Sequence, residues 1–344
     1  MSRVFNGYPD VAPETRERVL AAIRAHDFTP MHAARSLVTG RTHVIGVVLE
    51  TGAGHPDLQH PFFQEVLVGL KRTVGGVGFD LLLFTVRPAG NASGPEGASR
   101  GSQRYLVRAR QHRVDGLVVM GVDPHDPEVE ELAASGIPTM AVDLDLRGGR
   151  TGHVTSDNVG GAARAVGHLV ELGHRRIALI AGPSNTRPGI ERLLGYRRAL
   201  DRAGLEHLPE LVREGDFYPQ SGYAAMLALL DLPEPPTAVF AAADLMAAGA
   251  LRAIAERGQS CPRDISVVGF DDVELAGLLQ PPLTTIRQDK QGLGSAAGDA
   301  LMRMIADPEL EPPIGVVPVE LVARDSSYVV SRGRSPTHGE GVAG

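Results

Sequence analysis

The 344-residue chain contains a single cysteine, Cys261. One cysteine excludes an intrachain disulfide and favours a reducing compartment, so a cytoplasmic location is predicted. Next to Pro262, this thiol is expected to be an inert loop side chain. The sequence also lacks any run of about eighteen apolar residues, and its first residues have no apolar core, so it predicts neither a transmembrane helix nor a secretory signal.

Motifs of common catalytic and cofactor sites are missing as well. The glycine-rich segment 75–78 follows a predicted helix and precedes a predicted strand, the reverse of the order in a phosphate-binding loop. There is no GxSxG motif, and the spacing of His55 and His60 matches no common metal site. Of Asp271 and Asp272, at most one can face a cleft, because neighbours at a strand end point to opposite sides. The sequence therefore predicts no enzyme, no cofactor and no metal.

Positive charge is scarce overall but not at the start of the chain. The formal net charge is −7, which argues against a protein that coats nucleic acid with a wholly basic surface. Residues 1–43 nevertheless carry more arginine than acidic residues, whereas the rest of the chain is acidic. A basic arm on an acidic body gives weak support to a nucleic-acid contact at that end.

Apolar, β-branched runs alternate with segments of helical periodicity from residue 44 onward. For example, HVIGVVLE (43–50) precedes the helical pattern of 61–74, and RIALIAG (176–182) precedes that of 192–204. Strands that are apolar on both faces and alternate with helices are typical of parallel sheets covered by helices. There are too many such units for one sheet. The predicted fold is therefore α/β with two doubly wound parallel-sheet lobes, and a ligand is expected in the cleft between them.

Segments outside this alternation have their own patterns. Short helices are predicted at 13–26 and 31–39, where apolar residues recur at helical spacing. Residues 88–103 are rich in glycine, serine and proline, which indicates a surface loop. Residues 331–344 lack apolar periodicity and are expected to be a disordered tail.

Short motifs follow one another through nearly the whole chain. They are SRVFNG (2–7), PETRERVLAAI (13–23), AARSL (33–37), RTHVIGVV (41–48), HPFF (60–63), VDGLVVMG (114–121), SDNVGGA (156–162), GHRRIALIAGP (173–183), ERLLGY (191–196), VVGFDD (267–272) and PPLTTIRQD (281–289). Each motif is weak alone, but their order and spacing together are specific. On these motifs the chain resembles the LacI/GalR family of ligand-responsive transcriptional repressors, over residues 2–330.

The resemblance implies a domain organisation. Residues 1–30 would form a partial all-α helix-turn-helix headpiece, residues 31–43 a hinge helix and linker, and residues 44–330 a two-lobed, periplasmic-binding-protein-like core. The implied lobes comprise about 44–154 with 287–316, and about 155–286 with 317–330. The resemblance also implies a homodimer that binds operator DNA, and a small sugar-like effector that alters operator affinity by closing the lobes.

The beginning of the chain matches the end of the family's recognition helix, which enters the DNA major groove. We therefore expect the front of the headpiece to be encoded upstream of Met1; the alternative is a headless solute-binding sensor without DNA-binding activity. The residues implied to contact DNA are Ser2, Arg3, Asn6, Arg35 and Leu37. Arg3 would bond guanine or phosphate, and Leu37 would wedge into the minor groove unless it merely packs a helix.

Five positions are implied to bind the effector: Phe62, Asp143, Arg192, Phe217 and Asp271. The phenylalanines would contact the apolar face of a sugar ring. Arg192 and Asp271, facing each other across the cleft, would respectively donate hydrogen bonds to neighbouring hydroxyls and accept hydrogen bonds from them. The alternative is that the phenylalanines belong to the core and that Arg192 pairs structurally with an acid. Ala243 stands where the family often has asparagine, so the effector is expected to be smaller, less hydroxylated or differently posed.

Overall fold

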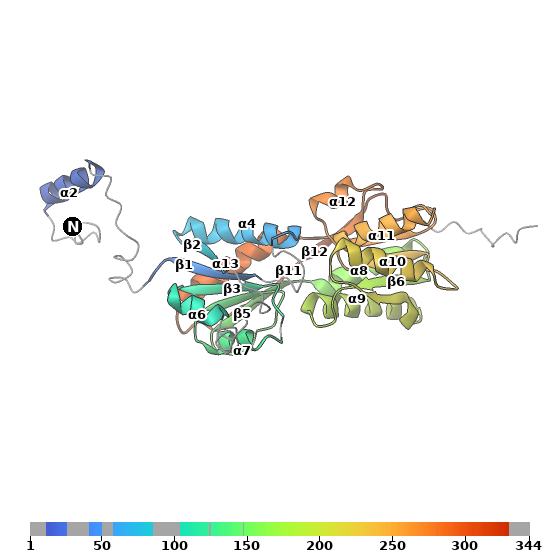
Figure 1. The fold of residues 1–344 in the computed structure, drawn as a ribbon, viewed down its shortest axis with the longest axis horizontal. Coiled ribbons are helices and arrows are strands. Elements are labelled where there is room, and N and C mark those ends of the chain that lie inside the picture. Colours follow the sequence, from blue (N-terminus) through green and yellow to red (C-terminus); the bar gives the residue numbers. More distant parts are fainter. Residues whose placement is uncertain are drawn as a thin grey trace, which may run out of the picture.

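The computed structural model describes residues 12–25, 41–49, 58–84, 104–123, 125–146 and 148–329. Several predictions lie outside these residues: the DNA contacts Ser2, Arg3, Asn6, Arg35 and Leu37, the second short helix, His55, the 88–103 loop and the tail. Helix α2 (Pro13–Ala25) matches the first predicted helix and lies apart from the two sheets (Figure 1). No helix in the described ranges has the length and apolarity needed to cross a bilayer.

The first lobe is built on a six-stranded sheet with the order β11-β5-β4-β3-β1-β2, parallel throughout. The strands are β1 (Val44–Leu49), β2 (Asp80–Phe84), β3 (Gly116–Met120), β4 (Thr139–Val142), β5 (Thr151–Ser156) and β11 (Ile314–Val317). Helices α4 (Pro61–Gly76) and α13 (Lys290–Ala306) contribute to one apolar cluster with the strands, and α6 (Arg104–Gln111) and α7 (Pro127–Ala134) to another. The sheet is thus covered on both faces.

The second lobe repeats this plan with the strand order β12-β10-β9-β8-β6-β7. The strands are β6 (Ile177–Ala181), β7 (Val212–Glu214), β8 (Ala238–Ala241), β9 (Ser266–Asp271), β10 (Thr284–Gln288) and β12 (Val319–Val322). The helices are α8 (Asn158–Glu171) and α9 (Arg187–Ala203) in one cluster, α10 (Pro219–Leu230) and α11 (Asp244–Glu256) in the other, and the short η2 (Pro209–Leu211) and α12 (Glu274–Leu278). Only β12, against β10, is antiparallel among the described pairings.

The predicted fold class, two parallel α/β lobes, is confirmed. The sequence did not reveal β5, whose residues TGHVTS are mostly polar or small, although all six are buried. This strand forms because β4 and β11 pair with it on both sides, which satisfies its main-chain groups. Tertiary pairing therefore overrides the weak strand preference of this segment.

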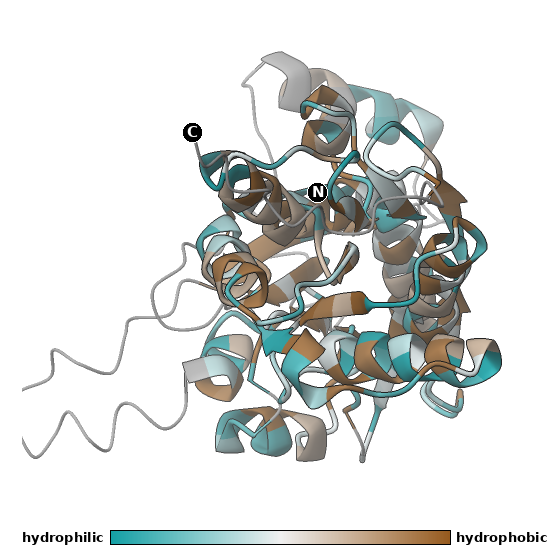
Figure 2. Cartoon of the chain, turned by 90° about the vertical axis from the view of Figure 1, so that its right-hand side faces the viewer, coloured by the Kyte–Doolittle hydropathy of each residue, from teal (hydrophilic) through white to brown (hydrophobic). Residues whose placement is uncertain are grey.

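Glycines set the closeness of the helix pairs that cover the sheets. Figure 2 shows teal and brown bands along many of the helices. The apolar residues of the covering helices join the clusters against the sheets. Gly294 of α13, Gly195 of α9 and Gly249 of α11 lie where each helix crosses its neighbour. A Cβ at any of the three would collide with a main-chain carbonyl of that neighbouring helix.

Cys261 lies half-buried in the second lobe, where its thiol donates a hydrogen bond to the Ser326 carbonyl at 3.3 Å. Burial raises the pKa of this thiol to about 12. Because the thiolate is the reactive form, the side chain is chemically quiet at neutral pH. This agrees with the prediction of an inert loop thiol.

Candidate functional site

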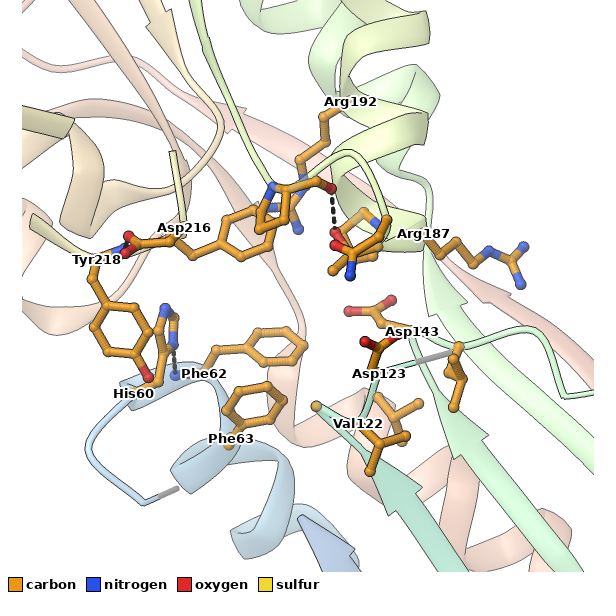
Figure 3. A pocket seen from close by; sticks show the side chains of 18 of the residues that line it. His60, Phe62, Phe63, Val122, Asp123, Asp143, Arg187, Arg192, Asp216 and Tyr218 are labelled. Carbon is orange, nitrogen blue, oxygen red and sulfur yellow. Dashed lines mark hydrogen bonds between the residues drawn. The ribbon is translucent and has the colours of Figure 1, made fainter. Parts of the chain in front are cut away.

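A cavity of about 360 Å3 opens between the lobes, at the carboxyl ends of strands from both sheets (Figure 3). Its first-lobe residues are His60, Phe62, Phe63, Gly121, Val122, Asp123, Val142, Asp143 and Leu144; its second-lobe residues are Pro183, Asn185, Thr186, Arg187, Pro188, Arg192, Asp216, Phe217, Tyr218 and Asp271. Parallel sheets commonly bind ligands at this edge. The cavity brings together all five effector positions implied by the sequence.

One wall of the cavity is aromatic. The N-terminus of α4 supplies His60, Phe62 and Phe63, and the loop before α10 supplies Phe217 and Tyr218. The His60 and Tyr218 rings meet edge to face with centroids 5.4 Å apart, so they join the two lobes at this wall. Phe62 and Phe63 are similarly arranged at 5.3 Å. The rings present apolar faces that suit the CH face of a cyclic ligand.

Arg192 of α9 is the buried cation of the site. Its Nε donates to Oδ1 of Asn158 at 2.9 Å and its Nη1 to the Ala242 carbonyl at 2.6 Å. Nη1 also lies 3.6 Å from Oδ1 of Asp271, and the guanidinium stacks on Phe270 at 3.8 Å. No hydrogen bond from Nη2 reaches any residue that the structure describes. This nitrogen is therefore the donor left for a ligand.

Burial governs the electrostatics of this region. It lowers the pKa of Arg192, against the opposing effect of the Asp271 and Asp143 carboxylates. Burial likewise raises the pKa of Asp143, although the hydrogen bond from Thr155 at 2.6 Å and the charge of Arg192 lower it. The Asp143 carboxyl and the Arg192 guanidinium thus lie where burial disfavours their charged forms. Such pKa shifts are typical of functional sites.

One implied arrangement needs correction. Arg192 and Asp271 do not face each other across the cleft: both belong to the second lobe and lie side by side. Gln288 donates to Oδ1 of Asp271 at 2.6 Å. The predicted structural pairing of Arg192 with an acid is therefore present, and Arg192 also lines the cavity. Its contact with an effector stays a prediction.

Asp272 turns away from the cavity, as the sequence predicted for one of the two adjacent acids. Its carboxylate accepts from Arg287 and from Arg324, each at 2.6 Å. Burial would raise the pKa of Asp272, but these two hydrogen bonds outweigh it and lower the pKa. Asp272 therefore fastens the end of β9 to the surrounding lobe, while Asp271 points into the site.

Three cavity residues have an unusual backbone. Asp143, Phe217 and Asp271 have φ of 56°, 71° and 121°, in the left-handed half of conformational space. Residues other than glycine adopt such values uncommonly, aspartate more readily than phenylalanine, and such strained residues cluster at functional sites. The Phe217 ring also lies directly over Gly182, where a Cβ would collide with it. Local strain and a small neighbour together aim this ring into the cavity.

A chain of polar side chains that was not predicted from the sequence connects the two lobes at the cavity. Asn158 donates to Oγ1 of Thr155 at 3.2 Å and to Glu191 at 3.0 Å, and Thr155 in turn donates to Asp143. Through Asn158, the chain reaches Arg192. The motifs SDNVGGA and ERLLGY contain Asn158 and Glu191, so these motifs were the available signal.

Ala243 is fully buried at the start of α11 and does not line the cavity. The neighbouring Asp244 is buried as well and accepts hydrogen bonds from Thr285 at 2.5 Å and from the Val273 amide at 2.9 Å. Burial and the nearby Asp271 raise the pKa of Asp244 well above its usual range. Asp244 is thus a carboxylate with a structural role. The expectation that alanine at position 243 changes the kind or pose of the effector stays a prediction.

The two lobes and the cavity between them define the class of periplasmic-binding-protein-like domains, and residues 166–327 match the family model described as "Periplasmic binding protein-like domain". The chain is 38% identical over 328 residues to the HTH-type transcriptional regulator CelR of Thermobifida fusca, covering 95% of this chain and 93% of the relative. It is 35% identical to the ribose operon repressor of Escherichia coli K12, covering 90% of each. The chain therefore belongs to the LacI/GalR family of transcriptional regulators.

Solved structures agree with this assignment. A CelR–cellobiose complex superposes with a TM-score of 0.74 at 34% identity, covering 95% of this chain and 94% of the other. The lac repressor dimer bound to operator and the anti-inducer ONPF gives a TM-score of 0.79 at 31% identity, with the same coverage. The resemblance drawn from the motifs is confirmed.

Proposed function

We propose that this chain is a cytoplasmic repressor without enzymatic activity, which binds operator DNA as a homodimer and responds to a small sugar-like effector. The effector contacts would be Phe62, Asp143, Arg192, Phe217 and Asp271. The observation that carries this proposal is the pairing of an aromatic wall with the free Nη2 of Arg192 and nearby carboxylates in one interlobe cavity. Its relatives CelR and the ribose operon repressor are regulators of the same family.

A sugar suits this combination of groups. A pyranose or furanose ring has an apolar CH face, which the Phe62 and Phe217 rings can cover, and a rim of hydroxyls that both donate and accept. Arg192 would donate to one hydroxyl, and Asp143 would accept from another. Because the contacts come from both lobes, a bound effector would favour the closed arrangement of the cleft.

Closure would be transmitted to DNA as a shift between two populated states. An effector changes operator affinity only through its different affinity for these states. The residues proposed to contact operator DNA are Ser2, Arg3, Asn6, Arg35 and Leu37. Two protomers would present these groups to the two halves of a pseudo-palindromic site.

A thermal-shift screen against sugars and nucleosides tests the effector proposal. A ligand at about one hundred times its Kd adds about 2.7 kcal/mol of stability, which is a readily measured rise in Tm. Phe217→Ala is expected to abolish most of this rise. Phe79→Ala, an aromatic truncation outside the cavity, should lower the basal Tm yet keep the ligand-induced rise. Equal rises in wild type and Phe217→Ala would contradict the assignment.

Operator binding is measured separately, by fluorescence anisotropy of labelled DNA with and without the stabilising ligand. A ligand-dependent change in operator affinity supports a regulator. Ligand binding without any DNA affinity would instead support the headless sensor. Chromatography of the sugar after incubation with the protein tests for catalysis, and a chemically altered sugar would show an enzyme.

Gly182→Ala should weaken effector binding without unfolding the protein. The added Cβ would collide with the Phe217 ring, so the ring must leave its position over Gly182 and intrude on the cavity. We expect a loss of affinity of about tenfold or more for the ligand found in the screen, equivalent to about 1.4 kcal/mol. Titration calorimetry measures it. Gly75→Ala, which adds a methyl in open space, is the matched control and should bind like wild type.

A further inference from the structure

We propose that the effector carries no negative charge: the cavity is built to accept neutral hydroxylated molecules and to reject their phosphorylated or carboxylated forms. This inference deepens the proposed function and rests on it. It follows from three features of the lining: its carboxylates, the partners of its arginines, and the occupied or absent first amide donors of the helices that begin at it.

Carboxylates outnumber guanidinium groups in the cavity. Four aspartates line it, Asp123, Asp143, Asp216 and Asp271, against the two arginines Arg187 and Arg192. They come from both lobes, so an anion bound between the lobes would meet carboxylates on either side. Figure 3 shows Asp123 and Asp143 close together on the polar side of the cavity, opposite the aromatic wall. Like charges brought together in a desolvated cleft strongly disfavour binding.

Both arginines already have carboxylate partners. Nε of Arg187 lies 2.8 Å from Oε1 of Glu191, four residues further along α9, and its guanidinium extends away from the cavity in Figure 3. Arg192 lies against the equally buried carboxylate of Asp271 at 3.6 Å. A phosphate or carboxylate ligand is usually held by a guanidinium whose charge it neutralises. Here that neutralisation is already provided from within the second lobe.

The helix N-termini at the cavity, which could otherwise attract anions, have few amide donors to offer. Helix α4 begins with Pro61, which has no N–H; its next two amides, of Phe62 and Phe63, donate to Nδ1 and to the carbonyl of His60. Helix α9 has Pro188 at its second position, and the amide of its third residue is capped by the Thr186 hydroxyl. Helix α10 also begins with a proline.

Matched pairs of ligands test the proposal on the full chain. The pairs are glucose and glucose 6-phosphate, ribose and ribose 5-phosphate, and glucose and glucuronate, titrated by calorimetry at low and at high salt. For each pair with a binding member, we expect the neutral sugar to bind at least about tenfold more tightly. The ratio should shrink at high salt, because ions screen charge repulsion. The 6-O-methyl ether of glucose, bulkier but neutral, should not show this salt dependence.

Asp123→Asn removes one cavity charge while keeping the carbonyl oxygen that accepts from the His125 amide. This substitution is expected to reduce the ratio of the affinity for the neutral sugar to the affinity for its anionic form by about threefold or more. Asp80→Asn makes the same charge change at the exposed start of β2, outside the cavity, and should leave the ratio unchanged.

Anionic members that bind as tightly as the neutral ones would overturn the charge inference while leaving the proposed sugar sensor intact. The inference also falls if the ratio is insensitive to salt and to Asp123→Asn, since the rejection would then come from size. If no sugar of either kind binds, the proposed function fails, and the inference fails with it.

Discussion

Arg192→Met is expected to destabilise the second lobe by about 3–5 kcal/mol, because it leaves a buried carboxylate without its cation partner. Asp271 is 3% exposed, and Arg192 is the cation beside it. Methionine keeps the apolar stem against Phe270 but removes the charge and the bonds to Asn158 and Ala242. Urea unfolding followed by circular dichroism measures the loss, and the effector-induced rise in Tm should vanish as well.

A double variant separates lost charge pairing from lost packing. Arg192→Met with Asp271→Asn removes both charges of this pair, while the asparagine oxygen can still accept from Gln288. We expect this double variant to be more stable than Arg192→Met alone, because the two residues interact directly. If instead the two substitutions are additively destabilising, the ion pair is not the source of the effect, and the loss belongs to packing and to the other hydrogen bonds.

Gly294→Ala is expected to cost about 1–3 kcal/mol, the usual penalty for overfilling a packed interior. The new methyl would collide with the Val66 carbonyl of α4, so α13 and α4 must move apart. Since α4 also carries Phe62 to the cavity wall, effector affinity should fall together with stability. Urea unfolding and ligand titration of the same samples give both quantities.

Gly167→Ala in α8 is the matched control. It too replaces a glycine within a helix, but its Cβ would meet no neighbour within 4 Å. Alanine is the better helix former, so this variant should gain about 0.5–1 kcal/mol. A loss of unfolding free energy for Gly294→Ala with a gain for Gly167→Ala would show that close helix contact matters. A gain for both variants would refute the tight crossing of α4 and α13.

The fold class was predictable because its signals are local. A segment such as IALIA (177–181), apolar on every residue and followed by helical periodicity, indicates a buried parallel strand wherever the rest of the chain lies. The strand TGHVTS (151–156) has no such pattern and was missed. Its strand conformation depends on two neighbours, one of which, β11, arrives more than 150 residues later.

Part of the membership of the candidate site was predictable from the sequence, but its arrangement was not. Motif resemblance pointed to Arg192 and Asp271, yet it put them on opposite sides of the cleft. Their pairing within one lobe depends on how α9 packs beside β9, and no local pattern encodes that contact. Likewise, Thr155 and Asn158 look like ordinary polar residues of a strand end and a helix start until the fold joins them to Asp143 and Arg192.

By itself, the sequence determined the two parallel α/β lobes, the family and five of the residues that line the cleft. Hydrophobic periodicity and motif spacing are properties of neighbouring residues, and they survive without coordinates. Only the tertiary structure decided which charges neutralise each other, which amides are already occupied and which donor remains for a ligand. Those outcomes depend on distances between residues far apart in the chain, and on burial, which makes each unpaired charge costly.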